Sequence, residues 1–217
     1  MPRMDSTTHA IVEALTRSIV EHRLQPGSKL VEQKLADQFG VSRTLVRQAL
    51  FKLSQNRLIR MEPARGAFVA APSVDEARQV FAVRRMLEAG MTSAFIQSAT
   101  AHDIQALKDH VAQEKAAVQR GDVPGRTALL GDFHVRMAQR MGNAVLAHLL
   151  TDLISRCALI TLMYQSSSSA EHSHEEHAAI VKALEARDEA LALRLMDRHL
   201  RNVEDALTLH PPASATP

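Results

Sequence analysis

The sequence contains no tryptophan, a single tyrosine, few glycines and only one cysteine, Cys157. One cysteine cannot form a disulfide within the chain, which excludes a disulfide-stapled secreted domain and fits a reducing cytosol. Scarce glycine, combined with abundant Ala, Leu, Arg and Glu, favours helices over sheets. The chain is therefore expected to be mainly α.

Two kinds of apolar segment are also missing. The opening residues MPRMDSTTHA contain no apolar stretch, so we expect no secretory signal. The most apolar segment, 143–164, is interrupted by His148, Asp152 and Arg156, which predicts a core helix rather than a membrane span. These absences predict a cytoplasmic protein without a membrane partner.

Charge is distributed unevenly along the 217 residues. Residues 1–72 carry 11 Lys and Arg against 6 Asp and Glu, whereas residues 73–217 carry 15 against 18. A chain of this length suits one large domain or two small ones. A basic first part on a mildly acidic body indicates a polyanionic partner for the first part alone.

The basic part has the pattern of a helix-turn-helix. Apolar residues at helical spacing predict a helix over 7–22, which Pro26 and Gly27 end, and a short second helix over 31–39. Gly40 supplies the turn, and Ser42 is a suitable N-cap for a third helix over 42–54. Two short helices joined by a glycine-containing turn form the helix-turn-helix unit.

After that unit the spacing of apolar residues changes from a helical period to simple alternation. Residues 59–62 and 67–70 alternate between apolar and polar, and Pro63 to Gly66 lie between them as a turn. A two-stranded hairpin with a basic tip after a helix-turn-helix is a wing. We therefore predict a winged helix-turn-helix domain over residues 1–72.

The third helix and the wing tip carry the residues expected to contact DNA. Arg43 and Arg47 lie one turn apart and share a face, where their like charges repel unless an anion lies opposite. At the exposed start of a helix in the major groove, arginines reach guanine edges or phosphates and hydroxyls bind phosphates. A glycine beside an arginine lets the wing backbone approach the minor groove closely. The predicted DNA-binding residues are Ser42, Arg43, Thr44, Arg47, Arg65 and Gly66.

From residue 73 onward the pattern is helical throughout. Six amphipathic segments with short breaks predict an antiparallel bundle over residues 73–210. The segments are 74–98, 102–120, 124–141, 143–165, 173–186 and 188–208. Residues 211–217 are predicted to be a disordered tail.

Three histidines in this bundle fall on apolar helix faces: His134, His177 and His199. Any one of them alone is explained by a hydrogen-bonded core histidine. Three imidazoles converging from different helices are instead how helical bundles build metal sites, and three suffice for zinc or nickel when water or a ligand completes the shell. The alternative is a polar pocket without a metal.

Several motifs give the chain a resemblance to a known family. The stretch PGSKLVEQKLADQFGVSRTLVRQALFKLSQNRLI, followed by RGAFVA, is similar to the winged helix of GntR-type bacterial transcription regulators. VRRMLEAGM, the FH at 133–134, GNAVL, EEHAAIVKAL and DRHL resemble the FCD effector domain of the FadR subfamily. The chain differs at Gln33, where family members often have an arginine that contacts phosphate.

The resemblance implies a homodimer that binds a double-stranded, inverted-repeat operator and whose binding a small-molecule effector changes. Many FCD domains hold a divalent metal with three histidines and an aspartate one turn before the first histidine. That position is Leu130 here, which cannot ligate, and Asp132 faces away from His134. The resemblance also places an arginine at Arg156 and another at Arg84 among the pocket-lining residues. Organic acids are the family's usual effectors.

His148, Asp152 and Arg156 recur every four residues along the apolar segment. They could form an ion pair on a partly buried helix face, which is common and weak. They could instead line the effector cavity, with Arg156 holding a carboxylate bidentately. We favour the cavity for Arg156, and expect the effector site to contain Arg84, Arg156, His134, His177 and His199.

The leading hypothesis is a transcription regulator that responds to an effector and is not an enzyme. One alternative is a metal-dependent hydrolase using the three-histidine site, although no HExxH or similar motif supplies a general base. Another is a non-specific architectural DNA-binding protein. The modest net positive charge of the first 72 residues argues against that alternative.

Overall fold

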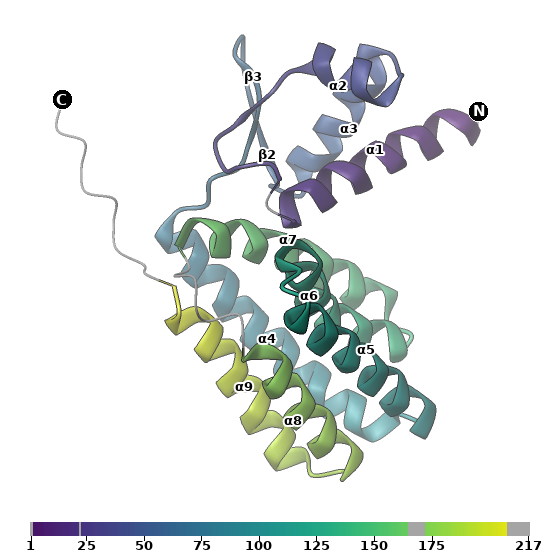
Figure 1. Ribbon diagram of the computed structural model, residues 1–217, viewed down its shortest axis with the longest axis vertical. Helices are drawn as coiled ribbons and strands as arrows, with labels where there is room; N and C mark the ends of the chain where they lie inside the picture. Colours follow the sequence, from purple (N-terminus) through teal and green to yellow (C-terminus); the bar gives the residue numbers. More distant parts are fainter. Residues whose placement is uncertain (1, 22, 165–171, 208–217) are drawn as a thin grey trace, which may run out of the picture.

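Helices make up most of the computed structural model, which describes residues 2–21, 23–164 and 172–207. The helices and strands form two units, a small winged unit near the N-terminus and a bundle of helices below it (Figure 1). The predicted fold class, mainly α with a small β wing, is confirmed. The predicted tail at 211–217 lies outside the described residues.

The winged unit is built on three helices whose apolar faces meet. Ile11, Ile19, Val46 and Leu50 are buried in its core. Gly40 adopts a φ of 64° after the second helix, and Ser42 caps the third by accepting a hydrogen bond from the Leu45 amide. The three helices are α1 (Pro2–Val20), α2 (Glu32–Phe39) and α3 (Arg43–Gln55).

The wing is a three-stranded antiparallel sheet of order β1-β3-β2. Its strands are β1 (Lys29–Leu30), β2 (Ile59–Glu62) and β3 (Gly66–Val69). The predicted hairpin is present, with its second strand beginning one residue earlier than expected. The sequence analysis missed β1, whose two residues pair with Phe68 and Ala67. Two residues are too few to show a period of their own.

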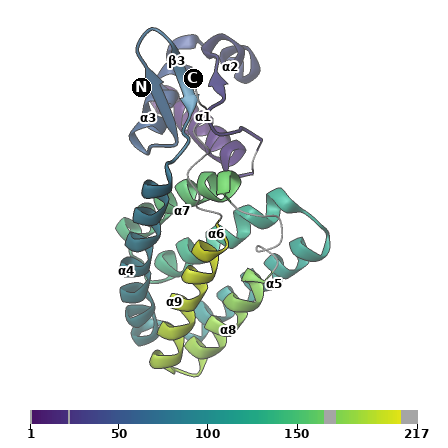
Figure 2. The same cartoon turned by 90° about the vertical axis from the view of Figure 1, so that its left-hand side faces the viewer.

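Within residues 73–164 and 172–207, which the structure describes, six helices form the bundle, close to the predicted ranges. Side-chain caps mark three of the starts: Ser73 before α4, Thr100 in a capping box with Asp103 before α5, and Asp188 before α9. Figure 2 shows α4 and α9 side by side along the bundle. The helices are α4 (Val74–Ser98), α5 (Ala101–Gln119), α6 (Val123–Arg140), α7 (Ala144–Tyr164), α8 (Ser173–Glu185) and α9 (Glu189–Asp205).

Helix α7 joins the two units. Leu159 on this helix is fully buried in the apolar core of the winged unit. Arg156 donates a hydrogen bond to the Asn56 carbonyl at the end of α3, and the Tyr164 hydroxyl donates to the Pro72 carbonyl. By length and composition alone Ala144–Thr161 could cross a membrane, but it packs against both units as a core helix does.

Candidate functional site: a basic groove and a buried histidine cavity

A basic groove lies between α3 and the wing. Arg43 and Arg47 stand at the start of α3 with side chains 61% and 65% exposed, beside the exposed Ser42 and Thr44. At the wing tip Arg65 is 72% exposed, and Gly66 has a φ of 97°. The structure thus brings Arg43, Arg47, Arg65 and Gly66 together along one groove, which Ser42 and Thr44 do not line.

Glu32 faces this groove from the start of α2 and pairs with both arginines. Its Oε1 accepts from Arg47 Nε at 2.9 Å, and its Oε2 accepts from Nη2 of Arg47 at 3.0 Å and of Arg43 at 3.3 Å. The hydrogen bond from Arg47 lowers the pKa of the Glu32 carboxyl. The like charges of Arg43 and Arg47 on one helix face repel unless an anion lies opposite them. The Glu32 carboxylate is that anion.

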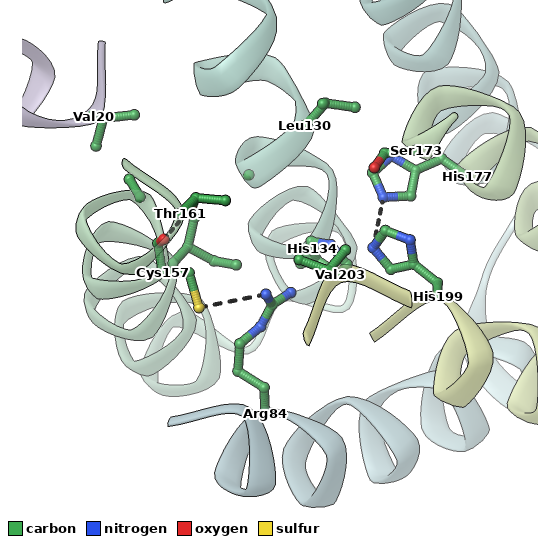
Figure 3. Close-up of a pocket in the computed structure, with 13 residues that line it drawn as sticks. Val20, Arg84, Leu130, His134, Cys157, Thr161, Ser173, His177, His199 and Val203 are labelled. Atoms are coloured by element: carbon green, nitrogen blue, oxygen red, sulfur yellow. Dashed lines mark hydrogen bonds between the residues drawn. The ribbon is translucent and has the colours of Figure 1, made fainter. Parts of the chain in front are cut away.

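The second site is a cavity of about 100 Å³ inside the bundle. His134, His177 and His199 come from α6, α8 and α9, and each is at most 3% exposed. One nitrogen from each ring lies within 4.8 Å of the others, and Nε2 of His177 is 3.2 Å from Nε2 of His199 (Figure 3). The three predicted histidines therefore converge.

A glutamate stands behind each of these histidines at its Nδ1. Glu114 contacts His177 at 3.0 Å, Glu176 contacts His199 at 2.6 Å, and Glu88 Oε2 lies 2.5 Å from His134. The hydrogen bonds of His177 and His199 to their glutamates fix these two rings and turn their Nε2 atoms towards each other, as carboxylates do in many metal sites. The sequence analysis did not identify these glutamates, because their partners lie on other helices.

The donor set fits a divalent metal. Zinc–nitrogen bonds of 2.0–2.1 Å at a tetrahedral angle place two nitrogens about 3.3 Å apart, close to the 3.2 Å between His177 and His199, and the nitrogen of His134 lies within 4.8 Å of both. Burial lowers the pKa of His134 and His199 to about 4 and also lowers that of His177. The imidazoles are therefore neutral near pH 7, the form that binds metal.

Many FCD domains have an aspartate one turn before the first histidine, and in this chain the residue at that position is apolar. Leu130 lines the cavity one turn before His134, beside Gly131. Asp132 is exposed and is not among the residues that line the cavity. The site consequently offers three neutral ligands and no carboxylate from α6.

Arg84 brings a buried positive charge to the same cavity. Its Nε donates to Glu88 Oε1 at 2.7 Å and its Nη1 lies 3.6 Å from Cys157 Sγ, while its Nη2 is buried without a partner among the described residues. Figure 3 shows the guanidinium pointing inward towards His134. Burial would raise the pKa of Glu88, but the Arg84 charge lowers it to about 2.

Arg156 is placed differently from the sequence expectation. It does not line the cavity, and its Nε points to the Asn56 carbonyl of the winged unit. His148 is exposed and lies 4.0 Å from Asp152, so neither reaches the cavity. The spacing of four correctly predicts one helix face, but Arg156 on that face meets the Asn56 carbonyl at the end of α3 rather than the histidines.

Comparison with known proteins identifies both units. The family model described as bacterial regulatory proteins, gntR family, matches residues 7–69, and the FCD domain model matches residues 79–202.

Similar proteins cover nearly the whole chain. HTH-type transcriptional regulator LutR of Bacillus subtilis is 29% identical over 208 residues, 85% of this chain and 94% of that protein. HTH-type transcriptional repressor RspR of Escherichia coli is 26% identical over 91% of this chain and 87% of its own. The structure of E. coli McbR/YncC superimposes with a TM-score of 0.80 at 20% identity, over 90% of this chain and 93% of that one.

Proposed function

The chain belongs to the GntR family of bacterial regulatory proteins and carries an FCD domain, and we propose that it is a cytoplasmic regulator whose DNA affinity a small carboxylate effector controls. Both matches identify a transcription regulator, so the metal-dependent hydrolase is set aside. We further assign it to the FadR subfamily, with the domains divided after Pro72.

The observation that carries the effector proposal is the unpartnered Nη2 of Arg84 in the histidine cavity. A buried guanidinium nitrogen without an acceptor is costly, and a carboxylate oxygen is the acceptor that matches it best. His134, His177 and His199 would hold zinc or nickel, which supplies a positive charge for the second carboxylate oxygen. With Leu130 in place of an acid, no carboxylate from α6 would occupy the metal, which leaves a coordination position for an oxygen of the effector.

Contacts with DNA are assigned to the basic groove. The N-terminal turn of α3 enters the major groove, where Arg43 and Arg47 read guanine edges and Ser42 and Thr44 bind phosphates. Arg65 and Gly66 follow the adjacent minor groove or backbone.

The cavity has a direct connection to the winged unit. Val20 of α1 forms part of the cavity wall, together with Cys157, Ala158 and Thr161 of α7. Leu159, which follows Ala158 on α7, is buried in the core of the winged unit. A ligand that shifts this wall changes how α1 and α3 are held, which is the physical basis for coupling effector to operator.

A homodimer would place two recognition helices on one two-fold operator. The face formed by α4 and α7 suits a second copy. Met86 and Val145 are 74% and 73% exposed, and Val83 and Leu149 lie exposed on the same two helices. Gly90 is exposed in the middle of α4 with nothing within 4 Å of its missing Cβ, so no contact within the protomer requires a glycine there.

The size of this face approaches that of a dimer interface. At 1.5 Å per residue α4 runs about 27 Å from Gln79 to Gln97, and two helices are about 20 Å wide. The resulting area of about 540 Å² falls just below the roughly 600–1,000 Å² that each partner of a stable complex buries, so side chains beyond these two helices would add to the interface. A glycine on such a face lets two helix backbones approach closely.

The effector proposal is tested by thermal shift of the full chain against two- to six-carbon carboxylates, with and without zinc. One acid should stabilise the protein by about 2.7 kcal/mol at a hundredfold excess over its Kd and change operator binding. Arg84→Gln combined with Glu88→Gln, which leaves no unpaired buried carboxylate, should abolish the shift, whereas Arg85→Gln, which removes the neighbouring charge paired with Glu204, should keep it. A response that survives in the Arg84→Gln, Glu88→Gln double variant contradicts the proposed site.

Dimerisation is tested by sedimentation of the full chain at tens of micromolar. Wild type should run as a dimer, and Met86→Glu should run as a monomer because a charge is buried in the apolar face. Gln113→Glu adds the same charge to an exposed position of α5 and should leave the dimer intact. A monomeric wild type, or a dimeric Met86→Glu variant, contradicts this assignment.

A further inference from the structure

Both arginines that face the DNA groove from α3 share one carboxylate, that of Glu32. We propose that Glu32 is a positioning residue that sets sequence specificity, because it orients Arg43 and Arg47 towards base edges and disfavours their use on phosphates. This inference rests on the proposed binding of operator DNA by α3.

The geometry of Glu32 suits a fixed support. Its side chain is 17% exposed, whereas those of Arg43 and Arg47 are 61% and 65% exposed. Two hydrogen bonds, from Nε at 2.9 Å and Nη2 at 3.0 Å, fix the plane of the Arg47 guanidinium. In the part of the chain that the structure describes, Nη1 and the second hydrogen of Nη2 have no acceptor and form the outer edge. That edge can donate to guanine O6 and N7, while the inner edge is held.

Electrostatics point the same way. Two unpaired arginines one turn apart form a patch that any phosphate backbone attracts. With Glu32 between them the net charge of the three side chains is +1, and a phosphate that approaches an arginine also meets a carboxylate. The lowered pKa of Glu32 keeps it ionised at neutral pH. Non-specific binding, which depends on phosphate contacts, is therefore weakened more than base recognition.

The wing provides a matched comparison within the same groove. Glu62 pairs with Arg60 and Arg65 at 2.6 Å each, and its side chain is 16% exposed. It lies on the wing, away from the α3 helix that reads bases. Removing the charge of Glu62 should strengthen binding to every duplex by a similar factor, so its effect differs from that expected for Glu32.

The experiment measures full-length wild type, Glu32→Gln, Glu32→Asp and Glu62→Gln by fluorescence anisotropy. The probes are a duplex that wild type selects from a random-sequence pool and a scrambled duplex of equal length, each at several salt concentrations. Circular dichroism and thermal midpoints report whether the fold is retained.

Glu32→Gln should bind the scrambled duplex several-fold more tightly, and its preference for the selected duplex should fall about tenfold or more. Its salt dependence on the scrambled duplex should steepen by about one to two units, because up to two arginines become free for phosphates. Glu32→Asp should recover part of the preference. Glu62→Gln should keep the wild-type preference within about twofold.

Several results would overturn the inference. An unchanged preference in Glu32→Gln means that Glu32 does not position the arginines. Equal losses on both duplexes together with a lower thermal midpoint mean that its role is structural. If wild type selects no duplex from the pool, the proposed function itself fails, and the inference fails with it.

Discussion

Replacing Arg84 with methionine should strongly destabilise the helical bundle. The side chains of Arg84 and Glu88 are 4% and 0% exposed, and their closest atoms are 2.7 Å apart. Methionine retains apolar volume but removes the cation that neutralises the Glu88 carboxylate. The variant therefore contains a buried carboxylate without its partner.

The size of the effect follows from the geometry. Unit charges about 4 Å apart attract by about 4 kcal/mol at an effective dielectric constant of 20. Removing one partner of a buried pair typically costs about 3–5 kcal/mol, because the remaining charge keeps its desolvation penalty. We expect the free energy of unfolding at pH 7 to fall by about 4 kcal/mol.

Urea denaturation followed by circular dichroism measures this loss. Glu88→Gln added to Arg84→Met removes the unpaired charge while keeping a polar group beside His134, and should recover at least half of the loss. In wild type the pKa of Glu88 is about 2 instead of 4.5, so its contribution is present above pH 4.5 and is lost as the pH falls towards 2.

The pH dependence of the variant differs from that of wild type. Without Arg84, burial raises the pKa of Glu88, so the carboxyl takes up a proton at a higher pH than in wild type. The stability difference between variant and wild type should therefore shrink as the pH falls below 7. A loss below about 1 kcal/mol, no recovery in the double variant, or a difference independent of pH would refute the reasoning.

Three further predictions concern the two sites. In competition titrations, Arg43→Ala and Arg47→Ala should each weaken binding to the selected duplex by about 1–3 kcal/mol, with little change in thermal midpoint. Unchanged binding together with a lower thermal midpoint would show that these arginines are structural. In calorimetry of chelator-stripped protein, His177→Ala should lose zinc binding. Leu130→Asp should bind zinc more tightly, because the new carboxylate lies one turn before the first histidine ligand. Unchanged zinc affinities in both variants would remove the metal from the proposal. Burial lowers the pKa of His199 to about 4, so this histidine resists protonation in the folded protein. In urea titrations, lowering the pH from 6.5 towards 4 should therefore destabilise metal-free wild type more than the His199→Gln variant. Equal slopes of unfolding free energy against pH in the two proteins would count against this.

Local signals were enough to predict the helices and the wing hairpin, though not β1, and to place the residues that we propose to contact DNA. Gly40, Ser42 and the apolar spacing that follows them mark the start of α3 without reference to the rest of the chain. Arg43 and Arg47 share a face of any helix that begins there. Glu32 gave no comparable signal, because its contact with them depends on how α2 crosses α3.

The convergence of the histidines was also predictable in outline. His134, His177 and His199 each fall on the apolar face of an amphipathic helix, and apolar faces meet in a bundle core. Their supporting carboxylates were not predictable, since choosing them among 24 acidic residues requires knowing which helices are neighbours.

The helical period of α7 determines that Arg156 shares a face with Asp152, but it does not determine what that face meets. The tertiary structure places Arg156 against the Asn56 carbonyl and buries Leu159 in the winged unit. It also brings Val20 of α1 to the cavity wall, over a hundred residues from the histidines. Periodicity fixes which side chains lie together on one helix, whereas the partner of each face follows from packing every apolar surface of the chain at once.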